Sequence, residues 1–161
     1  MPRPVPEYRE RVDTAALRLL DSRVRAGRVP LFHGGAPDLR PGDWILPPSL
    51  SGMPSMRERS EAAGFTRVTT SEDLVYVTTE RALAAAFAAD WTTRMPGTGR
   101  GWLYRVDLED HELVLDDDLP RGPFISFQLP RVRVSAVLDH GVNPNDRRHV
   151  RELRRFVALI A

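Results

Sequence analysis

The chain has 161 residues, 42% of them hydrophobic, with a formal net charge of +1 at pH 7 and no cysteine. The absence of cysteine excludes disulfides, cysteine-ligated zinc and thiol catalysis, and the small net charge excludes the strongly basic footprint of a dedicated nucleic-acid-binding domain. The length fits a single domain over 1–161, and no apolar run is long enough to span a membrane.

The first predicted element is an N-terminal helix. Residues 1–11 lack the apolar segment of a signal peptide and are rich in proline and charge, so we expect a loose arm and a cytoplasmic location. Apolar residues at helical spacing predict a helix over 14–25. Asp13 is its candidate N-cap and Gly27 its candidate stop.

Two short strands are predicted next, joined by a turn-rich segment. Residues 29–32 are typical of a strand that ends at His33, and residues 44–46 of a second strand closed by two prolines. The connection over 49–72 is rich in Ser, Gly, Pro and charge, with a short helix predicted around 55–63. A connection of that length in a compact domain is usually functional or disordered.

The middle of the chain predicts a strand, a helix and a strand. β-Branched and aromatic residues predict a strand over 73–78. Thr79 is a candidate cap for the alanine-rich stretch after it, which predicts a helix of about three turns. In the segment 102–109 the apolar residues alternate with the others, which is typical of a half-buried strand. Its predicted buried face carries Trp102, Tyr104, Val106 and Leu108.

The C-terminal part predicts a strand and a helix after an irregular segment. The strand is predicted over 131–141, and the final helix carries an apolar stripe with Asn145 or Asp146 as its cap. Short strands without regular βαβ alternation indicate a mixed α+β domain.

Three motifs whose side chains could take part in catalysis or binding lie on or just after predicted strands. They are FHGG at 32–35, VYVTT at 75–79 and LDDDLP at 115–120. Taken singly, each has an ordinary structural explanation: a surface histidine before a turn, a core tyrosine on a strand, and a solvated acidic loop.

The order of these features carries a more specific indication. FHGG with a following LRPGD, VYVTT followed at once by an alanine-rich helix, and GRGWLYRVDLE before DDD occur in this order across 31–118. This order resembles the rifampin ADP-ribosyltransferase family, small enzymes with a His-Tyr-Asp triad. The resemblance implies an α+β ADP-ribosyltransferase-like fold, with two small packed antiparallel or mixed sheets and flanking helices. It also implies NAD as co-substrate and no metal.

The resemblance assigns roles to individual residues. His33 matches the histidine that hydrogen-bonds the NAD ribose, because an imidazole nitrogen can donate or accept. Gly34 and Gly35 would let the cofactor approach the backbone. Tyr76 matches the tyrosine that packs on the cationic nicotinamide. Phe87, on the helix after Tyr76, is a candidate second aromatic for that ring, with core packing as the alternative.

The acidic member of the triad and the acceptor are less sharply indicated. Asp116 matches the family aspartate best, with Asp118 as the alternative; either carboxylate could stabilise a ribose cation or activate the acceptor. The Ser-Tyr-Arg stretch of the family is replaced by FISFQLPRVRV. The acceptor therefore stays open among a rifamycin hydroxyl, another small molecule, a protein and a nucleic acid.

Two functions of other classes are compatible with the sequence. A non-catalytic module could bind an acidic partner or nucleic acid through the basic C-terminal helix, although such a charged face is usually only solvated. Its arginines are Arg147, Arg148, Arg151, Arg154 and Arg155. A metal-dependent hydrolase using the acidic run with His33 or His111 is the weakest alternative, because no metal-ligand spacing supports it.

Overall fold

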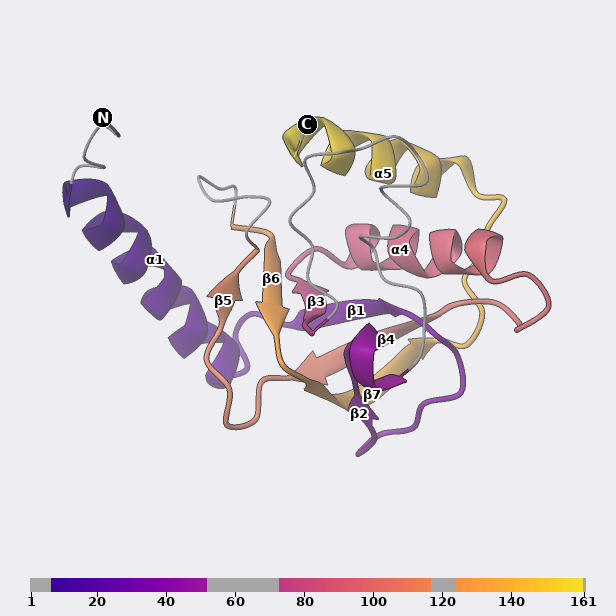
Figure 1. The fold of residues 1–161 in the computed structure, drawn as a ribbon, viewed down its shortest axis with the longest axis horizontal. Helices are drawn as coiled ribbons and strands as arrows, with labels where there is room; N and C mark the ends of the chain where they lie inside the picture. The colour runs from indigo at the N-terminus through magenta and orange to yellow at the C-terminus, as the bar shows by residue number, and fades with distance from the viewer. Residues whose placement is uncertain (1–6, 52–72, 117–123, 161) are drawn as a thin grey trace.

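The structure, a computed structural model, describes residues 7–51, 73–116 and 124–160 (Figure 1). Its elements in chain order are α1 (Glu7–Arg25), β1 (Leu31–Gly35), β2 (Trp44–Ile45), α2 (Pro48–Ser51), β3 (Val75–Thr78), α4 (Arg81–Arg94), β4 (Trp102–Asp107), β5 (Val114–Leu115), β6 (Ser126–Leu129), β7 (Val132–Asp139) and α5 (Arg147–Ile160). The expected α+β class is confirmed.

The described strands form one antiparallel sheet in the order β2-β7-β4-β1-β3-β6-β5, where two packed sheets were expected. β1 pairs with β4 through five residue pairs and β3 with β6 through four. Between β1 and β3 a single pair is formed, Phe32 with Thr78. We call this boundary the seam, because it divides β2-β7-β4-β1 from β3-β6-β5. Figure 1 shows β6 steeply turned from the direction of β1 and β4.

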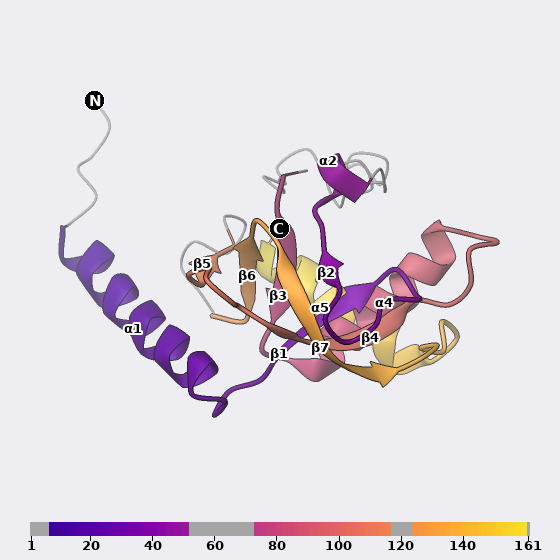
Figure 2. The ribbon, with the colours of Figure 1, turned by 90° about the horizontal axis from the view of Figure 1, so that it is seen from below.

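One face of the sheet, here called the inner face, holds the main core. Tyr104, Val106 and Leu108 lie buried there, as the alternating pattern predicts. Strands from both sides of the seam contribute to this core, which places the two parts of the sheet around one apolar interior. Helix α1 covers part of it through Leu17 and Leu20 and lies along one side of the molecule (Figure 2).

The opposite face, here called the outer face, is covered over β1 and β4 by α4. This contact is unusually close: a Cβ on Gly34 would lie 1.8 Å from the carbonyl oxygen of Ala84, and one on Gly101 would lie 2.0 Å from that of Ala88. Only glycine fits at these two positions, on β1 and just before β4, and the small alanines on α4 face them. The alanine-rich composition of α4 therefore follows from packing as well as from helix propensity.

Helix α5 forms a further layer on α4 (Figure 1). Phe156 is buried and its ring meets that of Phe87 edge-on, with centroids 5.4 Å apart. An ion pair between Arg155 and Glu80 joins α5 to the N-cap position of α4 at the surface. Apolar contact supplies most of the stability of such a layer, because exposed ion pairs contribute little.

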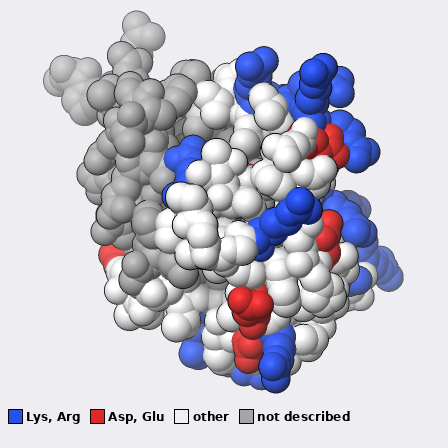
Figure 3. All heavy atoms as spheres, turned by 90° about the vertical axis from the view of Figure 1, so that its right-hand side faces the viewer, with Lys and Arg blue, Asp and Glu red and all other residues white. Residues whose placement is uncertain are grey.

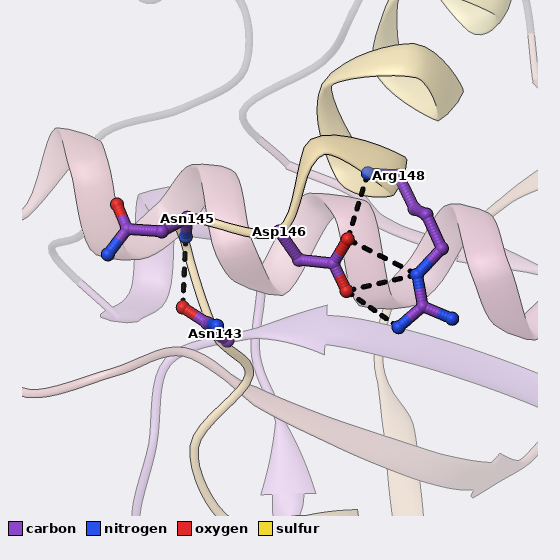
Figure 4. A network of polar contacts seen from close by, with 4 residues as sticks. All are labelled: Asn143, Asn145, Asp146 and Arg148. Atoms are coloured by element: carbon purple, nitrogen blue, oxygen red, sulfur yellow. Dashed lines mark hydrogen bonds and ion pairs between the residues drawn. The ribbon is translucent and has the colours of Figure 1, made fainter.

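The start of α5 has the predicted cap. Asp146 Oδ1 accepts a hydrogen bond from the backbone N–H of Arg148 at 2.9 Å, and its carboxylate also pairs with the Arg148 guanidinium (Figure 4). The guanidinium holds the pKa of Asp146 down at about 2. The neighbouring Asn145 instead donates its backbone N–H to the side chain of Asn143 at 3.0 Å. Of the two predicted caps, Asp146 is the one confirmed.

The start of α1 differs from the prediction. The helix begins at Glu7, so Asp13 lies inside it and the expected loose arm over 1–11 is wrong from Glu7 onward. The run EYRER consists largely of good helix formers. Residues 1–6 lie outside the described residues. The predicted stop at Gly27 is confirmed by its φ of 72°, a left-handed conformation that suits glycine.

The start of α4 also differs from the prediction. Its N-cap position is Glu80 rather than Thr79. The hydroxyl of Thr78 accepts a hydrogen bond from the Glu80 N–H at 3.0 Å, so a threonine one position earlier satisfies that donor.

Two strands, β5 and β6, were missed and lie where an irregular segment was expected. The predicted short helix around 55–63 falls outside the described residues. Within the part of the chain that is described, no helix is long and apolar enough to cross a membrane.

Candidate active site

His33 lies at the seam and makes a hydrogen bond across it, beside the single backbone pair. Its Nδ1 lies 2.8 Å from the backbone carbonyl oxygen of Tyr76. A carbonyl oxygen can only accept, so Nδ1 carries the hydrogen and Nε2 of the neutral ring is the acceptor. Although part of the residue reaches the surface, desolvation by burial lowers the pKa of His33, and the bond to Tyr76 opposes this only in part.

The surroundings of His33 on the inner face are rigid. Its ring lies against that of Tyr104, its partner on β4, with centroids 6.5 Å apart and planes at 28°. The Tyr104 hydroxyl donates to the Ala36 carbonyl at 2.5 Å and accepts from the Leu39 N–H at 3.3 Å. Burial raises the pKa of Tyr104 to about 12. The loop after β1 is therefore tied to β4 by a neutral phenol.

The glycine pair after His33 serves the fold directly. Gly34 faces α4, as described above. A Cβ on Gly35 would lie 2.9 Å from Nε2 of His33, so the missing side chain leaves room for the imidazole. Packing therefore explains the presence of both glycines without a cofactor, and the expectation that they admit a cofactor to the backbone stays a prediction.

The side chain of Tyr76 projects from β3 on the face of the sheet opposite to that of the His33 side chain. Val75 and Val77 belong to the inner core, so the alternation along β3 places Tyr76 on the outer face. Leu31 and Tyr104 place His33 on the inner face in the same way. The structure thus brings these two residues together through the backbone of Tyr76 rather than ring against ring.

Asp116 directly follows β5 and is 4% exposed. Ser126 Oγ donates to Asp116 Oδ2 at 2.6 Å, and the Asp116 N–H donates to the Ser126 carbonyl at 3.1 Å. Of the two candidate acids, Asp116 therefore has a defined and buried position. Asp118 lies outside the described residues.

The outer face of β3, β6 and β5 carries a row of buried polar side chains, here called the polar row. Its members are Thr78, Asp116, Ser126 and Gln128, which are the buried polar or charged residues among those described. Thr78 pairs with Ser126, and Gln128 pairs with Tyr76, so the row and the Tyr76 ring share one face. Buried polar groups cost free energy unless they are hydrogen-bonded. All four lie on this face of the sheet and not in the inner core.

Phe87 is not brought next to His33. It packs in the apolar cluster between α4 and α5, against Phe156 and near Leu83. The contacts of Phe87 in this structure are those of a core residue, which is the alternative that the sequence left open.

A cleft of about 410 Å³ lies between the end of α1 and β4, lined by residues such as Arg25, Arg105 and Glu109. None of the candidate residues lines it. Among the described residues no group of three or more His, Asp or Glu side chains could hold a metal ion.

Ser126 and Gln128 were not singled out from the sequence, although a signal for them exists. In SFQL the polar and apolar residues alternate, and the structure puts Phe127 and Leu129 in the inner core. The flanking prolines and the short run concealed this strand pattern. Among known proteins, no family model and no curated sequence matches this chain.

Proposed function

We propose that the protein is an NAD-dependent ADP-ribosyltransferase, which cleaves the nicotinamide–ribose bond of NAD⁺ and transfers ADP-ribose to an acceptor. The observation that carries the proposal is the buried Asp116 carboxylate in the polar row, on the same face as Tyr76. The ordered motifs around His33, Tyr76 and Asp116, which resemble the rifampin ADP-ribosyltransferases, add their support.

The reaction makes a specific demand on the protein. The bond between ribose C1′ and the nicotinamide nitrogen breaks, and nicotinamide leaves with the bonding electron pair. Positive charge then develops on the ribose, and an acceptor oxygen or nitrogen forms the new bond and loses its proton. A fixed carboxylate in a site of low dielectric stabilises that charge more strongly than one in water. Asp116 is the described carboxylate that fits this demand.

The two other residues would act on the substrate before the bond breaks. The Tyr76 ring offers a face to the cationic nicotinamide. Nε2 of neutral His33 is an acceptor suited to a ribose hydroxyl. Because their side chains leave opposite faces, one dinucleotide would reach both only at the seam. There, beyond Phe32 and Thr78, β1 and β3 have no further backbone pair.

The test is nicotinamide release from NAD⁺ by the wild-type chain and by three single variants. His33→Asn keeps a donor for the Tyr76 carbonyl but lacks the Nε2 acceptor. Tyr76→Ala removes the ring, and Asp116→Asn removes the charge at constant size. His140→Asn, at an exposed histidine, and Asp110→Asn, at an exposed aspartate, are matched controls.

The proposal expects release by the wild type and both controls, and a loss of at least tenfold in kcat/KM for each site variant. Equal rates in site and control variants would contradict it. Rifampin is added in parallel: stimulation of release, with a product heavier by one ADP-ribose, identifies a rifamycin hydroxyl as the acceptor. Release without stimulation directs the search to other small molecules, proteins and nucleic acids.

A second candidate is an interaction module that binds nucleic acid through α5. The observation in its favour is that Arg147, Arg151 and Arg154 are exposed and have no ion pair among the described residues, whereas Arg148 and Arg155 are paired. Figure 3 shows basic side chains at the top of one face, the level at which α5 lies, and others along its right edge and lower end, with acidic side chains among them. Binding to a nucleic acid that weakens steeply with salt, together with no NAD turnover, would favour this candidate.

A further inference from the structure

We propose that Ser126 is a positioning residue that orients the Asp116 carboxylate for the reaction. The inference rests on the proposed function and names a residue that neither the sequence motifs nor the resemblance assigns. It starts from the side-chain hydrogen bond within the polar row, Ser126 Oγ to Asp116 Oδ2 at 2.6 Å.

Two hydrogen bonds between the same residues fix the acid. The Asp116 N–H donates to the Ser126 carbonyl and holds the backbone of Asp116 at the end of β5. The Ser126 hydroxyl then holds one carboxylate oxygen, which restricts rotation of the short side chain. This charge-assisted hydrogen bond favours one orientation of the carboxylate.

The position of Ser126 is itself well determined. It lies on β6, which is paired with β3 on one side and β5 on the other, and it is directly opposite Thr78. Ser126 is 4% exposed, so its hydrogen bond does not compete with bulk water. Reacting groups need placement to within a fraction of an ångström, and residues behind them commonly supply it.

A purely structural role is the competing explanation, in which the hydroxyl only satisfies a buried carboxylate. The two roles differ in whether the effects of Ser126 and Asp116 on turnover are independent. If Ser126 acts by orienting the charge of Asp116, its loss has no further effect once that charge is gone. If Ser126 only supports the fold, its loss lowers activity by the same factor in both backgrounds.

The experiment is a double-mutant cycle on turnover of NAD⁺ labelled in the nicotinamide ring, with kcat and KM measured per folded protein. The single variants are Ser126→Ala and Asp116→Asn, combined in the double variant. Ser126→Thr tests rescue, because it keeps the hydroxyl on a β-branched residue suited to a strand. Ser135→Ala is the matched control, since the Ser135 hydroxyl is buried without a hydrogen-bond partner among the described residues.

We expect Ser126→Ala to lower kcat about 10- to 100-fold, as the loss of a residue that holds a reacting group in place commonly does. The KM for NAD⁺ should change less than threefold. Ser126→Thr should recover most of kcat. In the Asp116→Asn background, Ser126→Ala should change kcat less than twofold. Ser135→Ala should behave as wild type.

Two results would overturn the inference, and they are distinguishable. Turnover by the wild type with equal losses for Ser126→Ala in both backgrounds assigns Ser126 a structural role and leaves the proposed function standing. Absence of turnover in the wild type overturns the proposed function, and the positioning role of Ser126 with it. If Ser126→Ala does not fold, Ser126→Cys replaces it in the cycle, because the slightly larger thiol still fills the site and is a weaker donor.

Discussion

His33 and Tyr76 are joined by a hydrogen bond from Nδ1 to the backbone carbonyl oxygen, 2.8 Å long, beside the single backbone pair between β1 and β3. Farther along these strands the backbone pairing does not continue. The imidazole N–H thus gives the Tyr76 carbonyl the hydrogen bond that a backbone N–H would give it in a longer strand pairing. One side-chain ring therefore links the two parts of the sheet. The same bond sets the tautomer that leaves Nε2 as an acceptor.

The first prediction separates these two roles of His33. His33→Ala removes the donor to the Tyr76 carbonyl and should lower the free energy of unfolding by about 1–3 kcal/mol, because a buried acceptor loses its partner. His33→Asn places an N–H donor where Nδ1 lies and should lose less than half of that. Urea unfolding measures both. Equal destabilisation by the two variants would show that the bond contributes nothing to stability.

The second prediction concerns pH. Burial lowers the folded-state pKa of His33 below its ordinary value of 6.5, so the unfolded chain binds this proton more readily. The free energy of unfolding should therefore fall as the pH drops below about 6.5, down to the folded-state pKa. Above that window His33 is neutral in both states and adds no pH dependence to the stability.

Carboxylates titrate in the same acidic range, so the comparison is with His33→Asn. The wild type should lose more unfolding free energy than the variant between pH 7.5 and pH 5.5. Parallel pH profiles for the two proteins would contradict a depressed pKa at His33.

The third prediction concerns the contact between β1 and α4. In Gly34→Ala the new Cβ would lie 1.8 Å from a helix carbonyl, so the helix or the strand must shift. We expect a loss of about 3 kcal/mol or more, at the upper end of overpacking effects. Gly141→Ala is the control: its Cβ would meet only side-chain atoms, the nearest at 3.5 Å, and should change stability by less than about 0.5 kcal/mol. Thermal unfolding distinguishes the two.

The fourth prediction concerns Phe87. Its edge-on contact with Phe156 should appear as a coupling of about 0.5–1.5 kcal/mol in a double-mutant cycle on unfolding free energy. Phe87→Leu should leave KM for NAD⁺ within twofold of the wild type, because the side chain packs between the helices. A large rise in KM without loss of stability would instead support the role of Phe87 against nicotinamide.

Local signals in the sequence predicted a large part of the fold. The alternation around Tyr104, the stop at Gly27 and the cap at Asp146 depend on a few neighbouring residues and proved correct. The strands β5 and β6 form by pairing with each other and with β3, which is distant in the sequence. Each is too short to show a periodic pattern of apolar residues.

The candidate site shows the same division between local and distant causes. The FHGG motif is visible in the sequence, but the atom nearest to a Cβ built on Gly34 belongs to Ala84, fifty residues later in the chain. Ser126 was overlooked because its significance lies in a hydrogen bond to Asp116 across two strands. Such partners are fixed by register, which no short motif contains.

The seam also decides whether the domain can be divided. Strands β1, β2, β4 and β7 lie on one side of it, and β3, β5 and β6 on the other. The chain crosses from side to side between β2 and β3, β3 and β4, β4 and β5, and β6 and β7. A single cut therefore yields no fragment that consists of one complete side alone. The two sides share a single backbone pair, but their strands alternate along the chain. We therefore expect them to fold together as one unit.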